Sequence, residues 1–567
     1  MTEEARATRP ATVAAGPLDR EFRYAAVVLL LLLLIIMIKS AWLSEDAYIG
    51  YRSIDNLLNG YGFRWNTSER VQVFTDPLKL LIFAVFYAIT HELFVTTIVI
   101  SILWSFAAAI LLVTRIASSS AAGVAALAAL VSSRAFIDYT TSGLDNPLNY
   151  LLAAAFAVYF FRGPITLKTF QFAVFFASLA AFNRLDVILI FSPPVAYAAW
   201  VLFRRDKLAP RVLLKAAFIY SAPLWGWLLF STIYYGFTFP NTYYGKLYIG
   251  VPKSELRVQG LLYYINSINF DPLTLIVIGL GVSVAVASRD GRLIAGAVGV
   301  LLYLLYIVNI GGDFMSGRFF SLPFFCAVVF LVQRPAVRTT WIGLAVLFVA
   351  IGLLAQRPAL LNDESYRANK VVDFSGMDPN SVIDRRGIAD ERGSFYHESG
   401  LLPLARRKQF TPTHWWAATA APDVRAKGRQ IVVFGNIGFF GFHAGPDVHI
   451  VDYFGLGDPL LSKLPIIHAA EWRVGHYARS IPDGYIESIQ KRKNRIVNPK
   501  VHELYDVVRT LAKGRIWSGK RFREIVKINL GFYNGTIRSI TVEDTLPNPQ
   551  TPPVPGSTYP WPEDPQR

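Results

Sequence analysis

The feature that most constrains this chain is a series of long apolar runs separated by short polar loops. The first run covers residues 24–43, about twenty positions, which is enough for a helix to cross a bilayer. Lys39 is the only charged residue within it. Charged residues make up 17% of the whole sequence, whereas soluble proteins carry about a quarter. The sequence therefore predicts a polytopic α-helical membrane protein.

The distribution of basic residues predicts how the chain is threaded. Basic clusters lie at residues 162–168, 204–211, 289–292 and 334–338, and the positive-inside rule places such loops in the cytoplasm. This assignment requires the short apolar run 78–90 to be an interfacial or re-entrant helix rather than a span. The result is about 11 spans, with the N-terminus inside and the C-terminus outside. The predicted spans are 24–43, 93–114, 119–133, 146–161, 165–182, 187–203, 212–234, 272–288, 291–309, 319–333 and 339–355.

The same threading gathers the polar loops of interest on one side of the membrane. Loops 44–92, 134–145, 183–186, 235–271 and 310–318 would share the external face, whereas the cytoplasmic loops are short and basic. The function is therefore predicted on the external face of the membrane.

Hydropathy also divides the chain into predicted domains. After residue 355 the apolar runs cease, and short β-rich runs beginning at Gln430 and Val448 indicate a soluble α/β domain. Prolines then accumulate, and the tail that they define is expected to be extended and disordered. The predicted parts are a cytoplasmic arm 1–23, a transmembrane catalytic domain 24–355, a soluble extracytoplasmic domain 356–545 and a proline-rich tail 546–567.

Composition excludes several other classes of site. The formal net charge is +16, but no nucleic-acid-binding module is recognisable, so cationic loops near anionic lipid explain the charge better. Cys326 is the only cysteine, which excludes a disulfide framework and a cysteine metal site. No two histidines show the His-x-x-x-His spacing of a zinc helix. No metal ligands are identified, and a divalent cation stays open as a cofactor.

The two acids that follow the first apolar run are the leading catalytic candidates. Glu45 and Asp46 stand where that helix leaves the hydrocarbon, at the start of a long polar loop. A carboxylate there suits a general base that takes the proton of an attacking sugar hydroxyl. Alternatively, the pair consists of acids solvated by headgroups at a helix exit.

The loop between two predicted spans at residues 183–186 holds Arg184 and Asp186. Charges at membrane depth are costly and usually face a cavity or a partner. The guanidinium could grip a lipid phosphate through its bidentate fork, or the two residues could form a structural ion pair. Asp145 precedes another span, where it caps the helix or reaches the same pocket.

Two further external phrases combine charge with unusual backbone or aromatic content. Glycines surround Asp313 and Arg318. These two residues either line a water-filled pocket or form a local ion pair within a plain turn between spans. An aromatic-rich phrase contains Asn241 and ends at Lys246. It indicates either sugar stacking with a lysine at the phosphate or an interfacial aromatic belt.

Taken together, these phrases resemble the membrane-embedded, polyprenyl-phosphate-sugar-dependent glycosyltransferases of the GT-C superfamily. Within it, the chain is most similar to the terminal arabinofuranosyltransferases of the mycobacterial cell wall. It departs from the superfamily at Glu45, where relatives often have aspartate, and at Leu185, where relatives have proline. The resemblance is carried by residues 45–49, 52–62, 66, 69–71, 75, 77–78, 141–148, 183–186, 240–242, 311–315, 318, 451–459 and 473–476, which extend over nearly the whole chain.

The resemblance implies a donor such as decaprenyl-phospho-arabinofuranose, inverting transfer to a cell-envelope glycan, and an external domain that contacts the acceptor. It also implies a bacterial plasma membrane, with the active site on the extracytoplasmic face. Relatives that decorate pilin share these phrases, so a protein acceptor stays open. A non-catalytic transporter of lipid-linked glycans and a structural scaffold for cell-wall assembly stay open as functions of a different class. The expected roles are Asp46 as the base, Arg184, Lys246 and Arg318 on the donor phosphate, and Glu45, Asp145, Asp186, Asn241, Asp313 and His476 in substrate binding.

Overall fold

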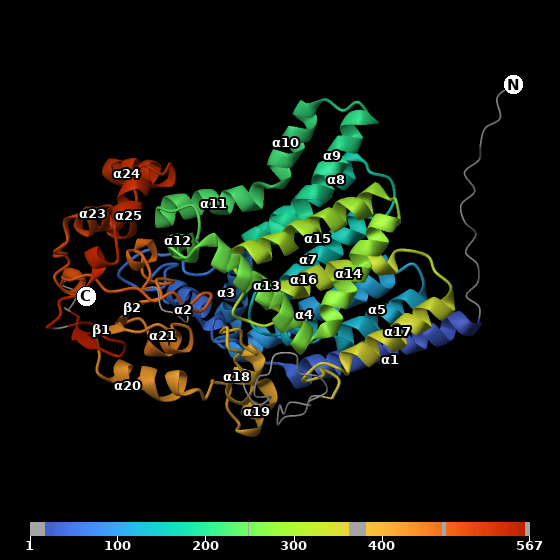
Figure 1. Ribbon diagram of the computed structural model, residues 1–567, viewed down its shortest axis with the longest axis horizontal. Helices are drawn as coiled ribbons and strands as arrows, with labels where there is room; N and C mark the ends of the chain where they lie inside the picture. Colours follow the sequence, from blue (N-terminus) through green and yellow to red (C-terminus); the bar gives the residue numbers. More distant parts are fainter. Residues whose placement is uncertain (1–16, 248, 362–381, 468–471, 551, 562–567) are drawn as a thin grey trace.

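The computed structural model describes residues 17–247, 249–361, 382–467, 472–550 and 552–561. Most of the predicted cytoplasmic arm therefore lies outside the described residues. The N-terminal part is a bundle of helices, and the C-terminal part packs against one end of that bundle (Figure 1). The chain is thus largely helical, with one small sheet confined to its C-terminal part.

Each apolar run predicted to span the membrane coincides with a helix or a pair of helices. Local hydrophobicity fixes these elements, because an apolar stretch in a bilayer must satisfy its backbone groups internally. The helices are α1 (Pro17–Ser40), α4 (Phe94–Leu111) with a π-helical turn (Leu112–Ile116), α5 (Ser120–Ser132), α7 (Asn146–Phe160), α8 (Leu167–Asn183), α9 (Ile188–Arg204), α10 (Pro210–Tyr220), α11 (Ala222–Tyr235), α14 (Pro272–Ala287), α15 (Gly291–Ile310), α16 (Arg318–Val332) and α17 (Arg338–Gly352).

By length and composition, four stretches of the described chain can cross a membrane as single helices. The number rises to six if each of two bent helix pairs counts as one span. Most of the other predicted spans are apolar helices of less than 18 residues. These helices confirm the fold class as a polytopic α-helical membrane protein. The four stretches are Arg20–Ser40, Phe94–Ile116, Leu185–Arg204 and Gly291–Ile310.

The bent pairs differ from the predicted straight spans. The predicted span 212–234 is broken between α10 and α11, which meet at 60°. Helix α13 (Lys253–Phe270) occupies about half of the predicted loop 235–271 and meets α14 at 110°. Pro272 at the first turn of α14 explains the second break, because proline starts a helix well and cannot continue one.

The remaining loops that are predicted to be external also contain short helices. The predicted interfacial run is α3 (Pro77–Thr90), a 14-residue helix. The others are α2 (Ala47–Leu58), α6 (Arg134–Asp138) and α12 (Asn241–Leu247).

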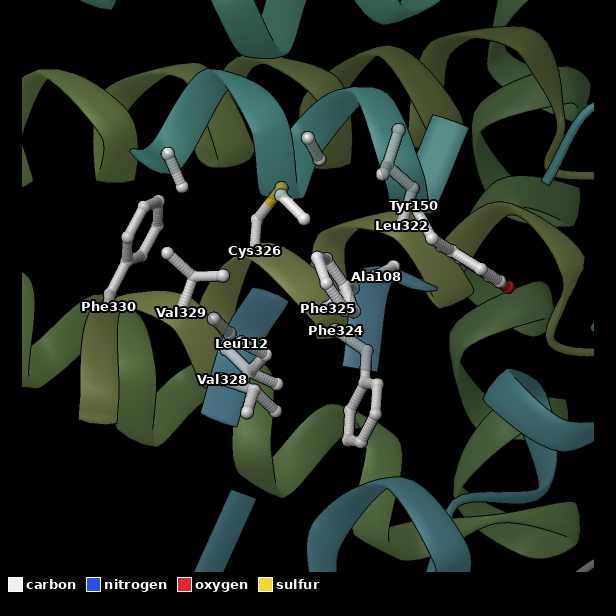
Figure 2. Close-up of a cluster of buried hydrophobic side chains, with 14 of the residues drawn as sticks. Ala108, Leu112, Tyr150, Leu322, Phe324, Phe325, Cys326, Val328, Val329 and Phe330 are labelled. Atoms are coloured by element: carbon white, nitrogen blue, oxygen red, sulfur yellow. The ribbon is translucent and has the colours of Figure 1, made fainter. Parts of the chain in front are cut away.

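Helix α16 forms the centre of the bundle, and all of its residues are buried. Figure 2 shows Cys326 on this helix beside Val329 and Phe330, with Tyr150 of α7 and Leu112 nearby. Small residues allow the neighbouring backbones to approach closely, as is typical of membrane helices. At Gly299 of α15, for example, an added Cβ would lie 2.1 Å from a carbonyl oxygen of α9.

The C-terminal part holds a three-stranded sheet in the order β2-β1-β3. β1 (Gln430–Val433) and β2 (Val448–Val451) are parallel and correspond to the two predicted β-rich runs. β3 (Thr558–Pro560) is antiparallel to β1 and comes from the proline-rich tail. The expectation that this tail lacks fixed structure is therefore wrong for the paired residues.

Short helices surround this sheet. They are α18 (Glu391–Ser399), α19 (Leu401–Arg406), α20 (Ala421–Ala426), α21 (Phe439–Ala444), α22 (Tyr485–Gln490), α23 (Pro499–Lys513), α24 (Gly519–Asn529) and α25 (Asn534–Ser539).

The C-terminal part is joined to the bundle by buried charged groups. Arg392 of α18 donates to Asp138 of α6 at 2.7 Å, and the carboxylate of Asp390 forms ion pairs with both Arg134 and Arg357. Buried charges are tolerated only when they are paired, so these contacts hold the two parts in a defined relation. The candidate site lies along this junction.

Candidate active site

A cavity of about 120 Å³ opens at the junction between the helical bundle and the C-terminal part. All five predicted external loops contribute to its walls, and C-terminal residues 435–437, 454, 456 and 475–476 complete them. The sequence-predicted residues that line it are Glu45, Asp46, Arg184, Lys246, Asp313, Arg318 and His476. Residues separated by hundreds of positions thus converge on one pocket.

Asp46 follows the end of α1 and immediately precedes α2, so its position is fixed by two helices. Its side chain is half-buried, and among the described residues it has no hydrogen-bond or ion-pair partner. Burial raises the pKa of the Asp46 carboxyl, while Arg318 acts in the opposite direction and Asp313 adds repulsion. An unpartnered carboxylate with a raised pKa is suited to accepting a proton.

Glu45 faces the C-terminal part and has a different role. Its Oε1 accepts hydrogen bonds from the backbone N–H groups of Gly438 at 2.6 Å and Phe439 at 3.1 Å. Burial raises the pKa of the Glu45 carboxyl to about 8, and the neighbouring charge of Asp46 adds to this. Glu45 is therefore mostly neutral near pH 7 and ties the α1–α2 loop to α21.

The contact at Gly438 is too close for any side chain. A Cβ at this position would lie 2.0 Å from the backbone oxygen of Glu45 and 2.8 Å from its carboxyl carbon. Real Cβ atoms do not approach this closely, so only glycine allows the two segments to meet here. This close approach seats the C-terminal wall of the cavity directly on the loop that carries Asp46.

Two guanidinium groups form the cationic side of the cavity. Arg184 and Arg318 both donate to Asp145 Oδ1, at 3.2 and 3.1 Å. Arg184 is also held by Asp186 at 2.8 Å, and Arg318 by Asp313 at 3.4 Å. Asp145 and Asp186 do not line the cavity, and they hold the two arginines that do. A contact between either acid and substrate stays a prediction.

One of these guanidinium groups retains unused hydrogen-bonding capacity. The Nε of Arg318 is buried and has no partner among the described residues. A buried unpaired donor is costly, which indicates that a ligand oxygen or water completes the site. Lys246 adds a third cation at the cavity wall, and its side chain is exposed.

Asn241 is not brought to the cavity. Its amide donates to the carbonyl oxygens of Gly455, Leu456 and Asp458, and its own oxygen accepts from Ser462 Oγ at 2.9 Å. Its polar atoms are therefore occupied in shaping the 455–458 turn. Asn241 does not line the cavity, and a direct contact between Asn241 and substrate stays a prediction.

His476 lines the cavity between two aromatic rings, with ring centroids 4.8 Å from Phe314 and 5.2 Å from Phe454. Its Nδ1 lies 3.3 Å from the carbonyl oxygen of Val474. Burial lowers the pKa of His476 to about 3, so the imidazole is neutral. With Nδ1 donating to Val474, Nε2 is an acceptor available to a hydroxyl.

Some residues around the cavity were not singled out from the sequence. Glu391 of α18 is buried and interacts electrostatically with Asp46, and Arg473 lies 3.6 Å from it. Arg473 stands three residues before His476, so the same phrase could have indicated it. No local sequence signal distinguished Glu391 or Asn436. Long-range packing places Glu391 beside Arg473 and brings Asn436, which follows β1, to the cavity wall.

The described residues include no group of three or more histidine, cysteine or acidic side chains arranged to hold a metal ion. The carboxylates of the cavity are instead interleaved with cations. The site therefore combines one unpartnered acid, a cationic wall and neutral polar groups, which suits the transfer of a group from an anionic leaving group.

Comparisons with known proteins support a transferase. No family model matches the chain. A terminal beta-(1->2)-arabinofuranosyltransferase of Mycobacterium tuberculosis is 24% identical over 536 residues, covering 78% of this chain and 82% of the relative. A protein of the same description from Corynebacterium glutamicum is 23% identical, covering 77% and 72%.

One solved structure, ArnT from Cupriavidus metallidurans bound to undecaprenyl phosphate, matches with a TM-score of 0.41 and 11% identity. It covers 77% of this chain and 86% of that chain.

The helical bundle and the curated relatives define the class as a multi-pass membrane glycosyltransferase. More particularly, the chain resembles the terminal arabinofuranosyltransferases, as the sequence phrases predict.

Proposed function

We propose that the chain transfers arabinofuranose from a polyprenyl-phosphate donor to a cell-envelope glycan, with inversion, on the extracytoplasmic face. The names of the curated relatives support the sugar. The observation that carries the proposal is the position of Asp46. Its carboxyl has no partner among the described residues and shares a cavity with Arg184, Lys246 and Arg318.

The chemistry is a single displacement. Asp46 accepts the proton of an acceptor hydroxyl, whose oxygen attacks the anomeric carbon of the donor sugar. The new glycosidic bond forms as the bond between the anomeric carbon and the phosphate oxygen breaks, and that electron pair leaves with the lipid phosphate. Attack opposite the leaving group inverts the anomeric centre.

The leaving phosphate requires positive charge placed in advance. Arg184 and Arg318 are held by Asp145, so they need little reorganisation when charge develops on the phosphate. The unpaired Nε of Arg318 is a further donor at this wall. Lys246 supplies a mobile point charge that can follow the phosphate as it departs.

The extracytoplasmic orientation rests on the positive-inside rule. Basic residues gather in the loops before α8, between α9 and α10, between α14 and α15 and before α17. The cavity lies at the opposite ends of these helices, so it opens toward the outside. A divalent cation, if one is used, would bind with the donor phosphate.

Two competing functions are tested by the same assay. Transfer to a surface protein such as pilin differs only in the acceptor. A lipid-linked glycan transporter would place its site near the bilayer midplane, within the bundle. The cavity is instead at the ends of the helices, and the C-terminal part forms one of its walls, which favours an enzyme.

The experiment uses the purified chain in nanodiscs with labelled decaprenyl-phospho-arabinofuranose, other labelled polyprenyl-phospho-sugars, and arabinan or pilin acceptors. We expect a labelled arabinan product with an inverted anomeric centre. Asp46→Asn should lower the rate by about 100- to 10,000-fold, the usual contribution of a general base.

Asp423→Asn is the matched control, because Asp423 is an exposed acid of α20 away from the cavity. It should transfer at the parental rate. Chelation with EDTA, followed by addition of Mg²⁺ or Mn²⁺, measures metal dependence. Full activity of Asp46→Asn would refute the role of Asp46, and movement of intact donor across the membrane without product would identify a transporter.

A further inference from the structure

Helix α24 and the turns around it have one face fixed to the protein and another that is apolar, basic and uncovered. The fixed face is anchored by Arg521, which is fully buried. Its guanidinium donates to the carbonyl oxygens of Leu511 at 2.9 Å, Ile233 at 2.7 Å and Tyr234 at 2.9 Å. Two of these carbonyls belong to the last turn of α11.

A second contact fixes the other end of α24. Asn529 Nδ2 donates to the carbonyl oxygen of Gly236 at 3.0 Å, and Asn529 Oδ1 accepts from Thr238 N–H at 3.0 Å. Helix α24 is therefore held against the point where α11, the second half of a bent apolar pair, ends. Figure 1 shows α10, α11 and α24 along one edge of the molecule.

The opposite face exposes large apolar side chains at unusual density. The exposed fractions are 79% for Trp517, 70% for Leu530 and 71% for Phe532, and Val526 is also exposed. Single exposed apolar residues are common on soluble surfaces, but a cluster of this kind indicates an interaction surface. On α10 and α11 the exposed residues Phe218, Trp225, Leu229 and Phe230 continue the apolar edge toward the bundle.

Basic residues flank this apolar face. Lys520 and Arg523 lie on the exposed side of α24, and Arg515 is exposed just before the helix. Spacings of three and four residues place Arg523, Val526 and Leu530 on a common stripe. Apolar residues accompanied by lysine and arginine are the pattern of helices that lie in a membrane interface, where the charges contact anionic headgroups.

We infer that α24 lies in the outer interface of the membrane and rests the C-terminal part on anionic lipid. Trp517, Val526, Leu530 and Phe532 enter the boundary between headgroups and acyl chains. Lys520 and Arg523 contact lipid phosphates. The inference follows from continuity with the lipid-facing edge of α10 and α11, and from the charge of the face.

The test places a fluorescent label on this face in nanodiscs that contain lipids with a spin-label quencher near the headgroup. Leu530→Cys and Phe532→Cys each accept a bimane label. Cys326 remains, because it is buried, and label-treated parental chain supplies the blank. Val497→Cys is the matched control, since Val497 is 68% exposed but lies at the far end of α23 from α24.

We expect quencher lipid to reduce the fluorescence at 530 and 532 at least about twofold relative to plain nanodiscs, with little change at 497. Replacing zwitterionic lipid by anionic lipid should increase the quenching in the chains labelled at 530 and 532. Lys520→Gln combined with Arg523→Gln should remove that increase.

Equal quenching at 497, 530 and 532 would overturn the inference. Protection of 530 and 532 from aqueous iodide without quenching by lipid would also overturn it, because a protein partner or second copy would then cover the face. Circular dichroism and elution volume of each labelled chain verify folding. The measurement needs no transfer activity, so its outcome does not depend on the proposed function.

Discussion

Replacing Glu45 by glutamine should change how the stability of the protein depends on pH. Glutamine keeps the oxygen that accepts from the N–H groups of Gly438 and Phe439, but it cannot ionise. In the native chain, burial raises the pKa of Glu45 from 4.5 to about 8. The substitution therefore preserves the contact while removing one titration.

The magnitude follows from the pKa shift. Between pH 4.5 and about pH 8 the folded chain holds a proton that the unfolded chain has released. The free energy of unfolding therefore falls as pH rises, by about 1.4 kcal/mol per pH unit and about 5 kcal/mol at most over the window. Above the folded pKa both states are ionised and the change stops.

The assay compares thermal unfolding of parental and Glu45→Gln chains in nanodiscs from about pH 5 to about pH 9. Burial also raises the pKa of Asp452 to about 6 and of Asp458 to about 7, and both chains retain these acids. The difference between the two midpoints should grow with pH and level off above about pH 8. Glu487→Gln, at an exposed acid, should show no such difference. Parallel curves for Glu45→Gln and the parent would refute the buried, neutral state of Glu45.

Three further predictions concern the cavity. The transfer rate should rise with pH as Asp46 loses its proton, at a pKa above the ordinary aspartate range. Lys246→Gln should shift this rise to higher pH, because Lys246 lowers the pKa of Asp46. An unshifted pH profile would contradict the assignment of Asp46 as the base. Gly438→Ala should lower the transfer activity by about 10-fold or more, because the added methyl group overpacks against Glu45. Gly535→Ala is the control and should leave transfer unchanged, because an added Cβ there meets no other atom. Equal transfer rates for the two variants would contradict the close contact at Gly438. Arg318→Lys should lower kcat/KM by about 10- to 100-fold in steady-state kinetics, because a single ammonium group cannot bind Asp145 and the donor phosphate at the same time. Unchanged kinetics would mean that the phosphate binds elsewhere.

The membrane part of the fold could be predicted well because its signal is local. Each apolar run is sufficient by itself to specify a helix in a bilayer. Because successive spans cross the membrane in opposite directions, every second loop lies on the same side. Counting the loops in this way predicted that Asp46, Arg184 and Arg318 share one site. The structure gathers these three residues around one cavity.

Features that depend on packing were harder to predict. Helix α13 carries Lys253, Glu255 and Arg257 in its first turns, so its hydropathy resembled that of a loop. Asn241 and Asp145 looked like ligand-binding residues, but their partners are backbone carbonyls and arginines from distant segments. Spacing in a sequence cannot separate a residue that contacts a ligand from one that positions its neighbour.

The tail shows a similar limit. Its prolines favoured an unpaired segment, yet β3 occupies an edge of the sheet. An edge strand tolerates Pro560, because a residue there need not donate on its outer side.

The bond between Glu45 and Gly438 also bears on how the enzyme is made. The two residues are 393 positions apart, so the loop carrying Asp46 is synthesised long before its partner. Until α21 arrives, Glu45 is an ordinary solvated acid and the cavity lacks one wall. A nascent chain in the membrane would therefore be unable to consume donor lipid, and competence would appear only late in biogenesis.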